Sequence, residues 1–63
     1  SNLGDKRRFE NLLADIADAN PNSVVQSVHF PKYRPGSDHP YAVSHWIKVD
    51  GKTVYGLTVL NQN

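Results

Sequence analysis

The sequence predicts a small α+β domain in which one N-terminal helix packs on a three-stranded antiparallel sheet, in the chain order αβββ. Three observations predict this fold. Apolar residues recur with a helical period early in the chain, apolar residues alternate in the second half, and Asp50-Gly51 joins two of the alternating runs. The length of 63 residues allows one small domain, residues 1–63, and leaves open that it was excised from a longer protein.

The first element is an amphipathic helix, predicted over Asp5–Ala19. Its apolar residues fall on one face at helical spacing: Phe9, Leu12, Leu13, Ile16 and Ala17. We expect Asp5 or Gly4 to cap its start, and Asn20-Pro21 to end it.

Basic residues gather at the start of this predicted helix. Lys6, Arg7 and Arg8 fall in its first turn, where the helix dipole disfavours cations. One interpretation is an anion site, because cations beside free helix N–H groups suit a phosphate. The other is a charged end that only faces solvent.

A strand and a long loop follow the helix. We predict the strand over Ser23–Phe30 and the loop over Pro31–Pro40. Lys32 and Arg34 flank Tyr33 within this loop. Long ordered loops are often functional, so these cations are candidate ligand contacts.

The second half, Tyr41–Leu60, predicts a β-hairpin. Its turn is either a two-residue loop of Asp50 and Gly51 or a type I turn with Gly51 as a left-handed bulge residue. The bulged turn gathers the more apolar set of side chains on one face, so we expect that turn, with Val43 opposite Leu57.

One helix covers only one face of such a sheet, so the other face is solvated or used. Trp46, Lys48 and Leu60 fall on this uncovered face, and we predict them as protein-contact residues. The Trp46 ring either packs under another element or contacts a partner. The last strand also offers an open edge to which another chain can add a strand.

Several kinds of chemistry are absent from the sequence. Without cysteine there is no disulfide, no thiolate zinc site and no cysteine nucleophile. His29, His39 and His45 are ten and six residues apart, which matches no compact metal motif, so we predict no metal and no cofactor.

No nucleophile turn, glycine-rich phosphate loop or carboxylate pair at acid–base spacing is visible, so we predict no catalytic residues. No apolar run approaches the roughly 20 residues that span a bilayer, and no signal peptide is visible. We therefore expect a soluble chain, with the cytoplasm as its expected location.

One stretch resembles the middle of a double-stranded RNA-binding domain. The residues that carry the resemblance are Gly36-Ser37-Asp38-His39, Tyr41, Val43, Val49-Asp50-Gly51-Lys52 and Gly56, about a third of the chain. In that family the first helix and the loop between the first two strands touch RNA across the minor groove. The resemblance implicates His39, with nearby Lys32 and Arg34. Ser37 stands where the family has proline, and these 63 residues lack the family's lysine-rich second helix.

A second resemblance is to the later half of papain-like folds. His45-Trp46 opens an apolar strand, Val54-Tyr55 follows the turn, and Asn61 comes sixteen positions after His45. This resembles the strand pair that carries the His and Asn of a cysteine peptidase or a papain-fold toxin. It implies His45 as base and Asn61 as its orienting partner, although the cysteine is missing.

These observations predict a binding module rather than an enzyme. A net charge of +1 is too small to argue for nucleic acid by itself, so the positions of the charges matter. We expect RNA to contact the helix start and the loop, through Lys6, Arg7, Arg8, Lys32, Arg34 and His39. The alternatives are protein interaction or self-association through the uncovered sheet face and edge, and the C-terminal part of a papain-like peptidase or toxin.

Overall fold

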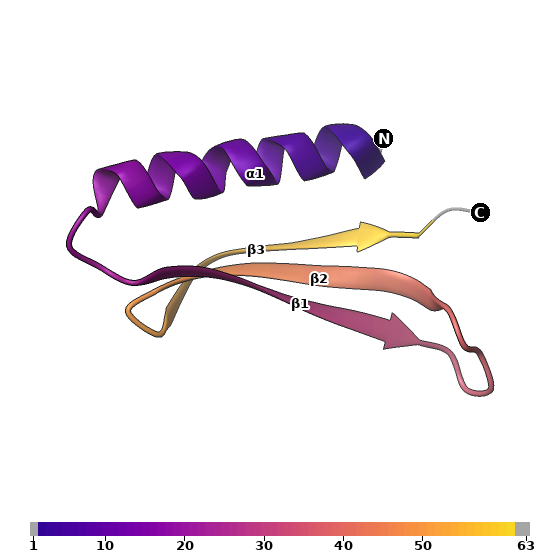
Figure 1. The fold of residues 1–63 in the computed structure, drawn as a ribbon. Helices are drawn as coiled ribbons and strands as arrows, with labels where there is room; N and C mark the ends of the chain where they lie inside the picture. Colours follow the sequence, from indigo (N-terminus) through magenta and orange to yellow (C-terminus); the bar gives the residue numbers. More distant parts are fainter. Residues whose placement is uncertain (1, 62–63) are drawn as a thin grey trace.

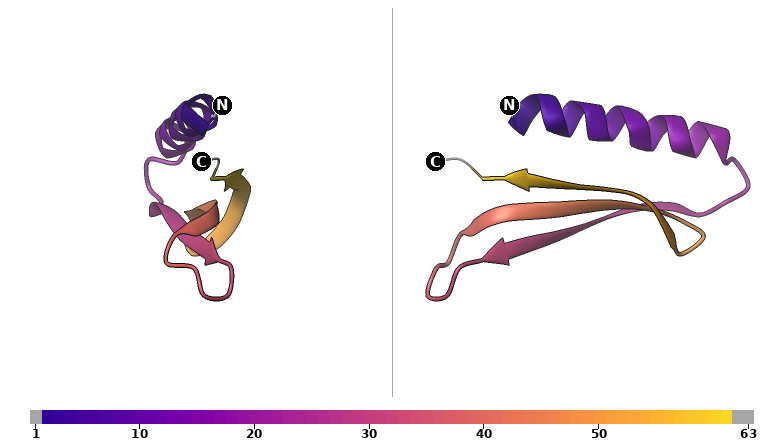
Figure 2. Two further views of the ribbon diagram at one scale, coloured as in Figure 1. Left: turned by 90° about the vertical axis from the view of Figure 1, so that its right-hand side faces the viewer. Right: turned by 180° about the vertical axis from the view of Figure 1, so that it is seen from behind.

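The computed structural model describes residues 2–61, which form one helix and three strands (Figure 1). The elements are α1 (Asn2–Ala19), β1 (Val25–Tyr33), β2 (Pro40–Val49) and β3 (Lys52–Leu60). The strands form an antiparallel sheet in the order β1-β2-β3, with α1 along one face (Figure 2). The predicted αβββ fold is confirmed.

Helix α1 begins three residues earlier than predicted, at Asn2 rather than Asp5. Asp5 is therefore not the cap, and its carboxylate instead accepts a 2.6 Å bond from Arg8 Nη2. Free N–H groups belong to the first four residues of a helix, here residues 2–5, so Lys6, Arg7 and Arg8 lie in the second turn, beyond them, and not in the first turn as predicted. The predicted end is confirmed, because Asn20 Nδ2 donates to the Ile16 carbonyl oxygen at 2.8 Å.

Strand β1 begins at Val25 and runs to Tyr33, so it starts and ends later than predicted. The predicted loop over Pro31–Pro40 is correspondingly too long, because Pro31 pairs with Val43 and only residues 34–39 connect β1 to β2. A proline is tolerated here because β1 is an edge strand, where one side of the backbone has no partner strand.

The turn between β2 and β3 is the two-residue loop, so the prediction of a bulged turn is wrong. Asp50 and Gly51 have φ values of 50° and 82°, and positive φ at both positions defines a type I′ turn. Asp50 also joins the turn to the start of β1. Its amide donates to the Val24 carbonyl oxygen at 2.8 Å, and its Oδ1 accepts from the Val24 amide at 2.9 Å.

The hairpin does contain a bulge, but it lies in β3 rather than in the turn. Val54 is the extra residue, since Ile47 pairs with Tyr55 while Lys48 pairs with Thr53. Beyond the bulge Val43 lies opposite Val59, so the expected pairing of Val43 with Leu57 is wrong.

The core between helix and sheet is small. Among the described residues its buried side chains are Phe9 and Ile47, whereas Ala42 and Ser44 are buried on the opposite face of the sheet, which carries Trp46. Phe9 of α1 packs against His45 and Tyr55, with ring centroids 5.4 Å and 6.2 Å away. These contacts show that α1 covers the face of the sheet that carries His45. No helix in the described residues has both the length and the apolar character needed to cross a membrane.

The molecule is elongated, with extents of 43 × 23 × 13 Å. The start of α1, the β1–β2 connection and the end of β3 lie at one end, which we call the loop end (Figures 1 and 2). The end of α1 and the β2–β3 turn lie at the other, which we call the turn end. Segments from the first, middle and last thirds of the chain thus meet at the loop end.

Candidate functional site

Charge is distributed unevenly between the two ends. Counted by position along the elements, the half of the molecule toward the loop end carries five basic residues, Lys6, Arg7, Arg8, Lys32 and Arg34, against three acidic ones, Asp5, Glu10 and Asp38. The half toward the turn end carries two basic residues, Lys48 and Lys52, against three acidic ones, Asp15, Asp18 and Asp50. The formal charge is therefore +2 in the half toward the loop end and −1 in the half toward the turn end, which makes up the net charge of +1.

The connection between β1 and β2 begins with a tight turn. The Ser37 amide donates to the Arg34 carbonyl oxygen at 3.1 Å. Pro35 and Gly36 occupy the two central positions, and Gly36 has a φ of 78°, as a type II turn requires. Local sequence therefore sets the conformation of the segment that carries Arg34.

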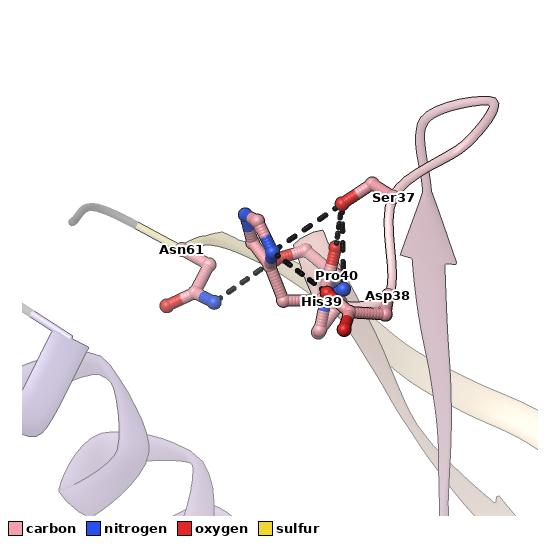
Figure 3. Close-up of polar contacts among 5 residues, drawn as sticks. All are labelled: Ser37, Asp38, His39, Pro40 and Asn61. Carbon is pink, nitrogen blue, oxygen red and sulfur yellow. Dashed lines mark hydrogen bonds and ion pairs between the residues drawn. The ribbon is translucent and has the colours of Figure 1, made fainter.

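His39 is held beside this turn by short-range contacts (Figure 3). The Ser37 hydroxyl donates to the His39 carbonyl oxygen at 3.0 Å and accepts from the His39 amide at 3.3 Å. The same hydroxyl lies 3.3 Å from His39 Nδ1, and an Asp38 carboxylate oxygen lies 3.5 Å from that nitrogen. The imidazole is positioned yet still exposed, so a ligand can reach it.

Arg34 stacks on an aromatic ring. Its guanidinium carbon lies 4.5 Å from the centre of the Tyr41 ring, which is cation–π distance. This pair borders a hollow of about 340 Å³, which is also lined by Leu60, the last residue of β3, and by Asn61. Asn61 is fixed there, because its Nδ2 donates to the Pro40 carbonyl oxygen at 2.9 Å.

A second hollow, of about 410 Å³, lies between α1 and the sheet and is lined by apolar and polar residues in equal number. Lys6 and Glu10 border it on the helix side. Leu60 and Asn61 line both hollows. The surface is therefore continuous from Lys6 of the helix to Arg34 of the loop.

His29 and His45 meet inside the second hollow. They lie directly opposite each other on β1 and β2, and their Nδ1 atoms are 2.6 Å apart. Burial lowers the pKa of His45, and the nearby His29 and Lys6 lower it further. Separation along the chain does not reveal this pair, because the two histidines are sixteen residues apart in the sequence. Antiparallel pairing of β1 with β2 is the signal that would have found it.

His45 and Asn61, the two residues of the papain-like resemblance, have separate partners in the described structure. His45 Nδ1 lies against His29, and the Asn61 side chain donates to the backbone of Pro40. Both residues line the second hollow, but their hydrogen bonds are made to other groups.

The residues predicted for protein contact share the face of the sheet that α1 leaves open, but they are spread along it. Trp46 is 36% exposed and packs on Phe30, with ring centroids 4.9 Å apart. Leu60 is 59% exposed and pairs with Ala42 near the loop end. Lys48 is half-buried beside the turn end. Trp46 and Phe30 therefore form the centre of this surface.

Comparisons with protein-family models, with curated proteins and with solved structures found no match for the chain. The two resemblances described above therefore stay predictions.

Proposed function

We propose that this domain binds RNA along its loop end. The supporting observation is that two basic segments distant in sequence, around Lys6 and around Arg34, border hollows that share Leu60 and Asn61. An RNA strand following this surface meets both segments. Phosphate contacts of this kind supply most of the affinity of nucleic-acid-binding proteins.

The residues suggest a division of roles. The exposed residues Lys6 and Arg7 of α1, and Lys32 at the end of β1, are placed to neutralise phosphates. Arg8 contributes less in this proposal, because Asp5 already accepts a hydrogen bond from it. Arg34 stacked on Tyr41 presents the kind of flat, cationic surface on which an unpaired base stacks.

The chain offers a charge-matched test of this proposal. Lys6→Ala combined with Lys32→Ala removes two cations from the half toward the loop end, whereas Lys48→Ala combined with Lys52→Ala removes two from the half toward the turn end. Affinity for a short RNA hairpin is measured for each variant over a series of salt concentrations. Each lost phosphate contact lowers the slope of log affinity against log salt by roughly 0.7 to 0.9.

We expect the slope to fall only for the loop-end variant. Equal affinities and equal slopes for the two variants would contradict the proposal. A nonspecific attraction of RNA to the protein depends on the net charge alone, and both variants have lost the same charge. A greater loss for the turn-end variant would move the binding surface to the opposite end of the molecule.

A second candidate function is self-association through the open face of the sheet. The observation that favours it is that Phe30, Trp46 and Leu60 share this face and remain 51%, 36% and 59% exposed. Sedimentation of the chain over a range of concentrations tests it, with Phe30→Ser and Trp46→Ala as variants. A monomer at all concentrations, in the wild type as in the variants, would exclude this function.

A further inference from the structure

His29 and His45 form a cross-strand pair whose geometry goes beyond ordinary sheet packing. They are directly opposite partners on neighbouring strands, and the two Nδ1 atoms approach to 2.6 Å. Their rings meet edge to face at 76°, with centroids 4.6 Å apart. Ser27, Phe9 and Lys6 line the hollow around them.

Two imidazole nitrogens at this distance form a hydrogen bond with each other. A neutral imidazole carries a hydrogen on one ring nitrogen and a lone pair on the other, so one Nδ1 donates while the other accepts. When the donating ring instead carries its hydrogen on Nε2, both Nδ1 atoms have lone pairs that point into the same small volume. Neutral imidazole nitrogen is also a favoured ligand of divalent zinc, copper and nickel.

We propose that the His29–His45 pair chelates a divalent transition-metal ion, with copper bound more tightly than zinc. Metal–nitrogen bonds of about 2.0–2.1 Å put two adjacent ligand nitrogens about 2.8–3.4 Å apart, depending on the coordination geometry. The pair reaches this separation by a small outward rotation of the rings. His29 is exposed and lies on an edge strand, so its ring has room to rotate.

The surroundings indicate which ions fit. Within residues 2–61 no group of three or more His, Cys, Asp or Glu side chains is placed to hold a metal ion, so the protein supplies two ligands and water supplies the rest. Such an open, nitrogen-based site suits copper and nickel, while magnesium and calcium require oxygen ligands. Lys6 borders the same hollow, and its positive charge opposes any cation that binds there.

The test uses the whole chain, freed of metal by chelator and dialysis, and titrated separately with Cu²⁺, Zn²⁺ and Mg²⁺. Calorimetry measures affinity, and the ring-proton signals of the three histidines report where Zn²⁺ binds. His29→Asn removes one proposed ligand from an exposed position, and His39→Asn is the matched control, since His39 is an exposed histidine outside the pair.

We expect His29→Asn to weaken Zn²⁺ binding by more than the roughly tenfold that losing an outer-shell partner costs, and His39→Asn to leave it unchanged. The affinity for Cu²⁺ should exceed the affinity for Zn²⁺, and Mg²⁺ should not bind. Equal Zn²⁺ affinities for the wild type and His29→Asn, or ring-proton shifts at His39 alone, would overturn the proposal. The ring-proton readout on the wild type decides the question even where a variant fails to fold.

Discussion

The ring of Trp46 occupies the space next to Gly56, its direct partner across β2 and β3. A Cβ atom on Gly56 would lie 2.8 Å from Trp46 Cδ1 and 3.1 Å from Trp46 Nε1. Phe30 packs on the same indole from β1. Three neighbouring strands therefore contribute to one aromatic contact on the open face, and glycine at position 56 leaves room for it.

This contact predicts that Gly56→Ala destabilises the domain. The added methyl displaces a bulky ring from Phe30, and overpacking of this kind typically costs about 1–3 kcal/mol. Urea unfolding measures the loss. In a Trp46→Ala background the clash is gone, and the same substitution should stabilise by about 0.5–1 kcal/mol because glycine is unfavourable inside a strand. The same destabilisation in both backgrounds would show that the ring is not the cause.

The burial of Phe9 predicts that this side chain holds α1 on the sheet. It is 6% exposed and packs on His45 and Tyr55, so Phe9→Ala should cost about 3–5 kcal/mol and release the helix from the sheet. Leu3→Ala, at a position 63% exposed on the same helix, is the control and should change stability little. Urea unfolding monitored by far-ultraviolet circular dichroism distinguishes the two. Equal losses of stability in the two variants would show that Phe9 is not the residue that holds the helix on the sheet.

The hydrogen bond that the Asp50 carboxylate accepts from the Val24 amide predicts that the domain loses stability in acid. The Val24 amide, followed by the Ser23 side chain, lowers the pKa of Asp50 below its usual 3.8. A carboxylate with a lowered folded-state pKa contributes stability that is fully present above pH 3.8 and is lost as the pH falls through its folded value.

Asp50→Asn isolates this contribution. Asparagine keeps the side-chain oxygen and tolerates the left-handed φ of 50°, but it does not titrate. Unfolding free energies measured from about pH 5 to about pH 1 should fall less steeply for Asp50→Asn than for the wild type. Parallel curves would mean that other carboxylates account for the acid sensitivity.

The stacking of Arg34 on Tyr41 predicts that the proposed site prefers single-stranded RNA to a duplex. If an unpaired base stacks beside Arg34, Tyr41→Ala should weaken single-stranded RNA binding by about 1–3 kcal/mol. Tyr41→Phe keeps the ring and should retain most of the affinity. Fluorescence anisotropy with a single strand and with a blunt duplex tests both points. Loss of affinity in Tyr41→Phe as well would assign the role to the hydroxyl instead.

The order of the elements was readable from the sequence, but the strand register was not. The helical period around Phe9 and the Asp50-Gly51 dipeptide predicted the helix and the hairpin correctly. The expected pairing of Val43 with Leu57 and the observed pairing with Val59 differ by two residues. Side chains alternate with a period of two, so both registers present the same apolar face, and periodicity does not distinguish them.

The candidate site was predictable only in part. Basic residues near Lys6 and Arg34 were visible in the sequence, because charge is a property of single residues. Their placement around Asn61, and the meeting of His29 with His45, depend on how three strands align. Pairings of this kind between distant residues follow from the register, which local patterns leave undetermined.

The sheet is a simple meander in which each strand pairs with the next one along the chain. Such connectivity has consequences for how the molecule folds. Both hairpins close over short loops, and hairpins of this kind form within about 1–10 μs. We expect the type I′ turn at Asp50-Gly51 to nucleate the first hairpin. We then expect β1 to add across β2 and α1 to dock last through Phe9, so the helix should be the first element to detach in a partial opening of the native state.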